Sequence, residues 1–358
     1  MKIGLVIYGS LSTLSGGYFY DRKLVETLRA AGDSVEIFSL PWRNYAAHLL
    51  DNVHFRLPEE LDILIQDELN HPSLLVANRQ RHPSPVVSLV HHLRCSEARP
   101  HWQNWLYRLV ERHYLQSVDG FIFNSETTRR EVQQLAGRAR PFVVAPPPTD
   151  RFGVQVSEEE IIRRAHASEL RILFLGNVIQ RKGLHLLLEA LSEATFDFRL
   201  DVVGSLSFEP GYAQAMQDKA RRSGLAQRVF FHGALDQEPL AEKLRTAHVL
   251  ALPSSYEGFG IAYLEGMGFG LPAIGTDQGA AGEILRHGVD GFIVSGGDAR
   301  ELADRLRFLA ERREVLAQMG VAARERYLRQ PSWEQTSHQI RKFLCALVEM
   351  SDLARSPL

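Results

Sequence analysis

The feature that most constrains the fold of this chain is a repeated alternation of short apolar runs with amphipathic helical stretches. The apolar runs are four to six residues long, show no strict polar alternation, and are bounded by Gly, Ser or Asp. Runs of this kind are typical of parallel strands that are buried on both faces of a sheet. They lie at 3–8, 61–66, 86–91, 120–124 and 141–145, and then at 171–176, 200–204, 229–233, 249–253, 272–275 and 291–294.

The segments between these runs have the apolar spacing of helices, and the clearest are 20–31, 102–117, 183–192 and 299–311. Strands and helices therefore alternate through two successive series, which predicts an α/β fold with two Rossmann-like, doubly wound parallel-sheet domains. A Pro-rich join at 145–150 cannot continue a helix or a central strand. We place one domain at 1–150, a second at 155–330, and a final helical segment at 331–358.

Composition narrows the functional class. The 358 residues suit two domains, and 45% hydrophobic with 23% charged residues is ordinary for a globular protein. The net charge of −2 gives no electrostatic reason to expect nucleic acid as a partner. The two cysteines, Cys95 and Cys345, are too few for a disulfide scaffold or a thiolate zinc site. No apolar run could span a bilayer, and the first one is typical of a buried strand, so we expect a cytoplasmic protein.

The segment 254–268 is the densest in residues that could bind a ligand. Gly258 and Gly260 follow a predicted strand and precede a short helix, whose N-terminus offers unpaired N–H groups to a phosphate. Glu257 stands before this helix and Glu265 lies one to two turns inside it, so two carboxylates flank the anion site. This spacing would fit a sugar on one side of a diphosphate and a ribose on the other.

A second strand-to-helix turn, at 176–183, carries Arg181 and Lys182 just before its helix. Cations oppose the helix dipole at this position, which indicates that an anion binds there. The turn is not a P-loop, because Arg181 occupies the place of its second glycine. No G-x-G-x-x-G follows the first strand, where Gly16 and Gly17 form a flexible pair in the loop.

These motifs resemble the GT-B-fold, family 4 type (group 1) glycosyltransferases, which are retaining and use nucleotide-sugar donors. The resemblance covers the whole second domain and is looser in the first. It rests on the E-x7-E pair Glu257/Glu265, the G-x4-R-K-G turn at 176–183, the stretch from Gly282-Glu283-Ile284 to Gly291-Phe292, Val90-His91, Asn124-Ser125 and the glycine-bearing first loop at Gly16-Gly17.

The resemblance implies a role for each matching residue. Glu257 would contact hydroxyls of the donor sugar, Glu265 the ribose, and His91 would lie under the sugar in a cleft between the domains. The diphosphate would be held by Arg181, Lys182 and backbone amides; the expected binding residues also include Asn177, Gly258, Phe259, Gly260, Ile261, Gly16 and Gly17. We expect Glu257, His91 and Lys182 to be the catalytic set, and the final helix to cross back onto the first domain.

Two features qualify this expectation. The family usually has an arginine directly after the glycine of the first turn, where this chain has Asn177, so we expect Arg181 to supply that charge. His91 and His92 are adjacent and would point to opposite faces of a strand, and we favour His91. We find no D-x-D or clustered His/Cys motif, so we expect metal-independent transfer from a UDP- or GDP-sugar without a further cofactor.

The acceptor side is less defined. Residues 79–140 contain ten arginines, no lysine and five acidic residues, and 99–112 interleaves arginines with Trp and Tyr. This segment could contact an anionic membrane surface at the inner face, or its apolar side chains Trp105, Leu106 and Leu109 could pack inward. The acceptor could be a sugar, a lipid-linked sugar or a small molecule.

Two other functions fit the same residues. A nucleotide-sugar epimerase of GT-B type also uses two Rossmann-like domains, and it would release no nucleotide when an acceptor is present. The third hypothesis is a non-catalytic protein that binds a sugar nucleotide, and it is favoured only by Asn177, which replaces the usual arginine. The complete set of Glu257, Glu265, Arg181 and Lys182 favours the hexosyltransferase.

Overall fold

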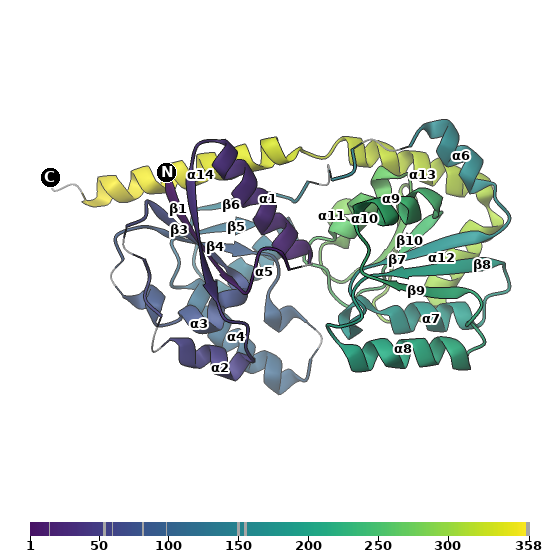
Figure 1. The fold of residues 1–358 in the computed structure, drawn as a ribbon, viewed down its shortest axis with the longest axis horizontal. Helices are drawn as coiled ribbons and strands as arrows, with labels where there is room; N and C mark the ends of the chain where they lie inside the picture. The colour runs from purple at the N-terminus through teal and green to yellow at the C-terminus, as the bar shows by residue number, and fades with distance from the viewer. Residues whose placement is uncertain are drawn as a thin grey trace. The chain divides into compact units, whose positions relative to one another are not determined.

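The computed structural model describes residues 1–13, 15–52, 55–58, 60–80, 82–97, 99–148, 151–153 and 156–355. The chain divides into two compact units, one of Met1–Pro148 with Pro331–Leu358 and one of Thr149–Gln330. Of the predicted join at 145–150, residues 149 and 150 lie outside the described part. Each unit is a six-stranded parallel sheet with helices on both faces (Figure 1), which confirms the predicted doubly wound α/β class.

The sheet of unit 1 has the order β2-β1-β3-β4-β5-β6 and all its pairs are parallel. Its strands are β1 (Lys2–Tyr8), β2 (Ser34–Leu40), β3 (Ile63–Asp67), β4 (Val86–Val90), β5 (Gly120–Phe123) and β6 (Phe142–Val144). The sequence analysis did not predict β2. This strand is at the edge of the sheet, and the exposed Ser34, Glu36 and Ser39 interrupt it, so it lacks the continuous apolar run of its neighbours.

The helices of unit 1 cover both faces of this sheet (Figure 1). They are α1 (Gly16–Ala30), α2 (Tyr45–Asp51), η1 (Glu68–Asn70), α3 (His71–Leu74), η2 (Ala77–Arg79), η3 (Arg94–Ser96), α4 (His101–Leu115), α5 (Glu126–Ala136) and α14 (Trp333–Arg355). Helix α1 begins at Gly16, because Ser15 Oγ accepts a hydrogen bond from Tyr18 N at 3.3 Å. Gly16 and Gly17 are therefore in the first helical turn, not in a flexible loop as predicted.

Helix α14 belongs to unit 1 although it comes last in the sequence. Ile340, Leu344 and Leu347 are buried in the same core as the strands and α1. Arg341 makes an ion pair with the buried Asp33, with Nε to Oδ2 at 2.7 Å. Apolar burial and this ion pair to a buried carboxylate thus fix the last helix to unit 1.

The sheet of unit 2 has the order β12-β11-β10-β7-β8-β9, again with parallel pairs only. Its strands are β7 (Leu170–Leu175), β8 (Phe198–Val203), β9 (Val229–Gly233), β10 (Val249–Ala251), β11 (Ala273–Thr276) and β12 (Gly291–Val294). The connections run outward in both directions from β7 and β10, which lie side by side. This is the topological switch point, where doubly wound folds bind ligands at the carboxyl ends of the strands.

The helices of unit 2 enclose this sheet from both sides (Figure 1). They are α6 (Glu158–Ala165), η4 (Gln180–Lys182), α7 (Leu184–Ser192), α8 (Pro210–Arg222), α9 (Gln237–Thr246), α10 (Ile261–Gly268), α11 (Ala281–Ile284), α12 (Ala299–Glu311) and α13 (Arg313–Leu328). The turns into α7 and α10 follow β7 and β10, so the topology brings the two predicted motifs together.

Candidate functional site

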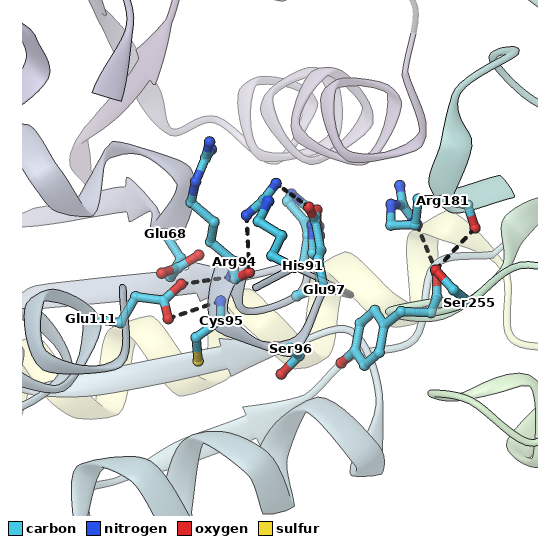
Figure 2. A network of polar contacts seen from close by, with 12 residues as sticks. Glu68, His91, Arg94, Cys95, Ser96, Glu97, Glu111, Arg181 and Ser255 are labelled. Atoms are coloured by element: carbon cyan, nitrogen blue, oxygen red, sulfur yellow. Dashed lines mark hydrogen bonds and ion pairs between the residues drawn. The ribbon is translucent and has the colours of Figure 1, made fainter. Parts of the chain in front are cut away.

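The two predicted motifs of unit 2 meet at its switch point. The turn after β7 carries Arg181 and Lys182, and the turn after β10 carries Ser254, Ser255 and Glu257. Ser255 N donates to Arg181 O at 2.8 Å, and Ser255 Oγ lies 3.4 Å from the same carbonyl oxygen (Figure 2). The backbones of the two turns are therefore joined directly.

Lys182 and Glu257 form a buried ion pair across these turns. Lys182 Nζ lies 2.5 Å from Glu257 Oε1, and Ser254 Oγ donates to the same oxygen at 2.7 Å. Burial alone would raise the pKa of Glu257, but the charges of Lys182 and Arg181 hold this pKa below its usual value. Glu257 is therefore a carboxylate at neutral pH.

The contacts of Glu257 leave one of its oxygens available. Both hydrogen bonds go to Oε1, and within the described residues Oε2 accepts none. An ionised carboxylate oxygen with free lone pairs is a strong acceptor for hydroxyl groups. Glu257 is thus oriented by Lys182 and Ser254 while its second oxygen can bind a ligand.

Helix α10 starts at the far end of the same turn. Its N-cap is Gly260, whose φ of 101° is accessible to glycine but strained for other residues. Among the described residues no side chain caps this N-terminus, so the first N–H groups, beginning with Ile261, are available to an anion. Gly258 and the buried Phe259 lead into the turn as predicted.

The second glutamate of the E-x7-E pair is on the buried face of α10. Arg151 Nη1 donates to Glu265 Oε1 at 3.3 Å, which partly offsets the effect of burial that raises the pKa of Glu265. The sequence analysis did not predict Arg151. It stands directly after the Pro-rich join and is over a hundred positions from Glu265, so no local motif reveals the pair.

In the turn after β7, Asn177 stands where the glycosyltransferases that the sequence resembles usually have an arginine. Asn177 Oδ1 accepts a hydrogen bond from Ser205 N at 3.3 Å, so Asn177 links the turns after β7 and β8. Arg181 Nη1 donates to Tyr256 O at 2.7 Å, which places its guanidinium beside the turn that precedes α10. Whether Arg181 supplies the missing charge to a ligand stays a prediction.

In unit 1 the two adjacent histidines have different partners. His91 Nε2 lies 2.9 Å from Oδ1 of Asp21, which is fully buried on α1. His92 Nε2 lies 2.9 Å from Glu97 Oε1. A Cβ atom added to Gly17 would be 3.2 Å from the His91 ring, so Gly17 of the predicted glycine pair lies beside His91. The predicted role of His91 toward a donor sugar stays a proposal.

Two groups in unit 1 place carboxylates and imidazole within 4.8 Å of one another: Asp21, Asp67 and His91, and Glu68, His71 and Glu111. In the second group Glu111 accepts the backbone N–H groups of Arg94 at 2.6 Å and Cys95 at 3.2 Å (Figure 2). His71 Nε2 bonds to the Tyr45 hydroxyl at 3.0 Å. These hydrogen bonds involve both oxygens of Glu111 and Nε2 of His71, and His91 Nε2 is paired with Asp21 Oδ1.

Helix α4 carries an apolar stripe that faces solvent. Trp102, Trp105, Leu106 and Leu109 are 64%, 60%, 46% and 37% exposed, whereas the residues it buries include Glu111. The alternative in which Trp105, Leu106 and Leu109 pack inward is therefore wrong. The reason is that Glu111 turns inward to bind the backbone of η3, which rotates the apolar stripe outward.

The surroundings of this stripe are basic. Trp105, Arg108, Leu109 and Arg112 line a shallow groove with Gln134, Leu135 and Gly137. The exposed charged side chains of α4 are all basic, because its single carboxylate, Glu111, is buried. No described helix is long and apolar enough to cross a membrane.

Both units contain regions that match glycosyltransferase family models. Residues 157–326 match the family model of the glycosyl transferases group 1, and residues 42–148 match the glycosyl transferase 4-like domain. The phosphatidyl-myo-inositol mannosyltransferase of Mycobacterium leprae is 26% identical over 95% of both chains. Sucrose-phosphate synthase from Thermosynechococcus elongatus superposes with a TM-score of 0.83 at 20% identity, covering 98% of this chain and 99% of that one. HepE of Anabaena, in complex with UDP-glucose, gives 0.75 at 19% identity, covering 97% and 100%.

Gly183 tests how closely the two turns must approach. Its φ is 72°, and an added Cβ would lie 2.0 Å from Pro253 O; Gly224 has a φ of 70° and nothing within 4 Å. We expect Gly224→Ala to cost about 1–2 kcal/mol from backbone strain. Gly183→Ala should cost about 1–3 kcal/mol more, because it also forces the turns apart. Urea unfolding of both variants measures the difference, and equal losses would contradict the close approach.

Proposed function

We propose that this chain, which belongs to the group 1 glycosyltransferases, binds the diphosphate of its donor at the switch point of unit 2. Its activity is that of a retaining transferase that uses a nucleotide-sugar donor. The observation that carries the proposal is the Lys182–Glu257 pair, at 2.5 Å, beside the uncapped start of α10. Cation and helix N-terminus both attract phosphate, and the carboxylate beside them can accept hydroxyl groups.

In this proposal the leaving group is stabilised electrostatically. As the bond between the sugar and the diphosphate breaks, negative charge develops on the leaving phosphate. Lys182, Arg181 and the N–H groups from Phe259 to Ile261 offset that charge, and they are already in place before reaction. The acceptor hydroxyl attacks on the face from which the diphosphate leaves, and its proton passes to the departing phosphate oxygen. The configuration is therefore retained without a covalent intermediate. This route requires no metal ion or further cofactor.

Glu257 and Glu265 have different roles in this arrangement. Glu257 Oε2, the oxygen that its internal hydrogen bonds leave free, accepts hydroxyl groups of the sugar and fixes its orientation. Glu265, oriented by Arg151 at 3.3 Å, accepts hydroxyl groups of the ribose. Asn177 and Gly258 shape the turns around the diphosphate. In unit 1, Gly16, Gly17 and His91 act on the sugar side of the reaction.

We propose a UDP- or GDP-sugar as the donor. The UDP-glucose complex of the structurally similar HepE supports the uridine alternative. Binding measurements with UDP and with GDP distinguish the two donors.

The acceptor side is proposed to work at an anionic membrane surface. Exposed Trp and Leu side chains on α4 would enter the interfacial region, and Arg108 and Arg112 would meet anionic headgroups. The name of the mycobacterial relative includes a phosphatidylinositol lipid, which supports a lipid-linked acceptor. Cys95 and Cys345 are unpaired, which agrees with a reducing compartment and hence with the inner face of the membrane.

The two glutamates should separate kinetically. Glu265→Gln removes a ribose contact that is the same in ground and transition states, so the donor KM should rise while kcat changes little. Glu257→Gln misorients the reacting sugar, so kcat should fall about 100-fold or more. Steady-state kinetics with the donor, after melting curves show that both variants fold, measures both effects. The reverse pattern would contradict the placement of the sugar beside Glu257.

The membrane proposal predicts that Trp105→Ala reduces binding to vesicles of anionic phosphatidylglycerol about five- to tenfold, since the interface buries less apolar surface. Binding of the wild type should weaken with added salt and be much lower on neutral phosphatidylcholine. Trp42→Ala is the matched control, because Trp42 is equally exposed, at 62%, but is not on α4. Co-sedimentation with vesicles measures the binding of the wild type and of both variants under each of these conditions. Equal losses in both variants, or equal binding to both lipids, would contradict the proposal.

A further inference from the structure

A buried cluster in unit 1 surrounds His91, the residue expected to act on the sugar. His91 follows β4 directly, Asp67 ends β3, and Asp21 is on α1, which follows β1. Strands β1 and β3 are neighbours from which the connections of this sheet diverge, so the cluster is at the switch point of unit 1. One atom from each of these three side chains lies within 4.8 Å of the others.

One face of α1 holds the His91 ring. Gly17, Tyr20 and Asp21 have the i, i+3, i+4 spacing that places side chains on the same side of a helix. An added Cβ on Gly17 would be 3.2 Å from His91 Cδ2, and the Tyr20 ring meets the imidazole edge-on at 5.4 Å between centroids. The Tyr20 hydroxyl donates to Ala145 O at 2.8 Å, which fixes that ring in turn. The imidazole has little freedom to rotate.

Asp21 provides the polar part of this enclosure. Its side chain has no exposed surface, and Oδ1 bonds to His91 Nε2 at 2.9 Å. Its other oxygen, Oδ2, is buried and has no hydrogen-bond partner in the described part of the chain. A buried carboxylate with so little compensation is very costly unless its partner carries the opposite charge. The cluster therefore favours a protonated imidazole.

We propose that Asp21 is a positioning residue that holds His91 as an imidazolium, with Nε2–H fixed on Asp21 Oδ1 and Nδ1–H left to donate to the substrate. Among the described residues Nδ1 makes no hydrogen bond, and the His91 side chain is 15% exposed. His91 would then supply a hydrogen bond and a positive charge to an electron-rich oxygen of the bound substrate. It could not act as the general base for the acceptor. This inference rests on the proposed function of the chain as a glycosyltransferase.

The charges around His91 support this assignment. Burial lowers the pKa of His91, but the carboxylates of Asp21 on α1, Asp67 on β3 and Glu68 on η1 raise it to about 9. Burial and the charge of Asp21 raise the pKa of Asp67 to about 7, so Asp67 is only partly charged at neutral pH. The imidazolium is fully formed below the ordinary histidine pKa and is lost as pH rises through about 9. Asp21 is the partner in direct contact.

The test uses the full chain without donor, so it does not depend on the proposed function. NMR titration of the imidazole resonances, with His91 assigned by comparison with His91→Gln, gives its pKa in the wild type and in Asp21→Asn. We expect the wild type to titrate well above 6.5, and Asp21→Asn to titrate lower by about one unit or more. Asp33→Asn is the matched control, since Asp33 is an equally buried carboxylate of unit 1 that pairs with Arg341. It should leave His91 unchanged.

Kinetics then distinguishes a positioning role from a merely structural one. In Asp21→Asn the alkaline limb of the kcat profile should move to lower pH together with the His91 pKa, and Asp21→Glu, which keeps the charge, should restore much of it. A wild-type His91 that titrates near 6.5, or one that Asp21→Asn does not shift, overturns the proposal. So does a uniform loss of kcat at all pH values. Failure to bind any nucleotide would overturn the proposed function while leaving the titration result standing.

Discussion

The ion pair between Lys182 and Glu257 is the interaction on which the proposed donor site depends. It joins two turns that are more than seventy residues apart in sequence and meet because β7 and β10 are adjacent at the switch point. A lysine ammonium and a carboxylate are each costly to bury alone, and their mutual attraction offsets part of that cost, so removing either one leaves an uncompensated buried charge. The pair therefore keeps a cation and an anion side by side, and the proposed binding of a phosphorylated sugar uses both charges.

Unit 1 uses the same topology with other residues. Its switch point carries Asp67 at the end of β3, and its neighbouring strand end carries His91, held by Asp21 from α1. In each unit a buried carboxylate is paired with a basic side chain at the carboxyl ends of the strands. The position of these charged pairs thus depends mainly on where the parallel strands end.

Much of this could be predicted from the sequence because the signals are local. All eleven predicted apolar runs coincide with strands to within two residues at either end, and the E-x7-E pair lies within one strand-turn-helix segment. Edge strand β2 was missed because its exposed face breaks the apolar run. Arg151 and Asp21 were missed because their partners, Glu265 and His91, are far away in sequence. The outward stripe of α4 depends on the inward turn of Glu111, which periodicity cannot show.

The most direct test of the account is calorimetric titration of UDP and of GDP into the wild type, Lys182→Ala and Lys243→Ala. Lys243 is a half-buried lysine of the same unit, paired with Asp201 at 2.9 Å, and so controls for the loss of an ion pair. The account predicts that the wild type binds one of the nucleotides and that Lys182→Ala loses about 1.5–3 kcal/mol of binding, roughly 10- to 150-fold, while Lys243→Ala binds like the wild type. Equal binding by Lys182→Ala and the wild type would contradict it.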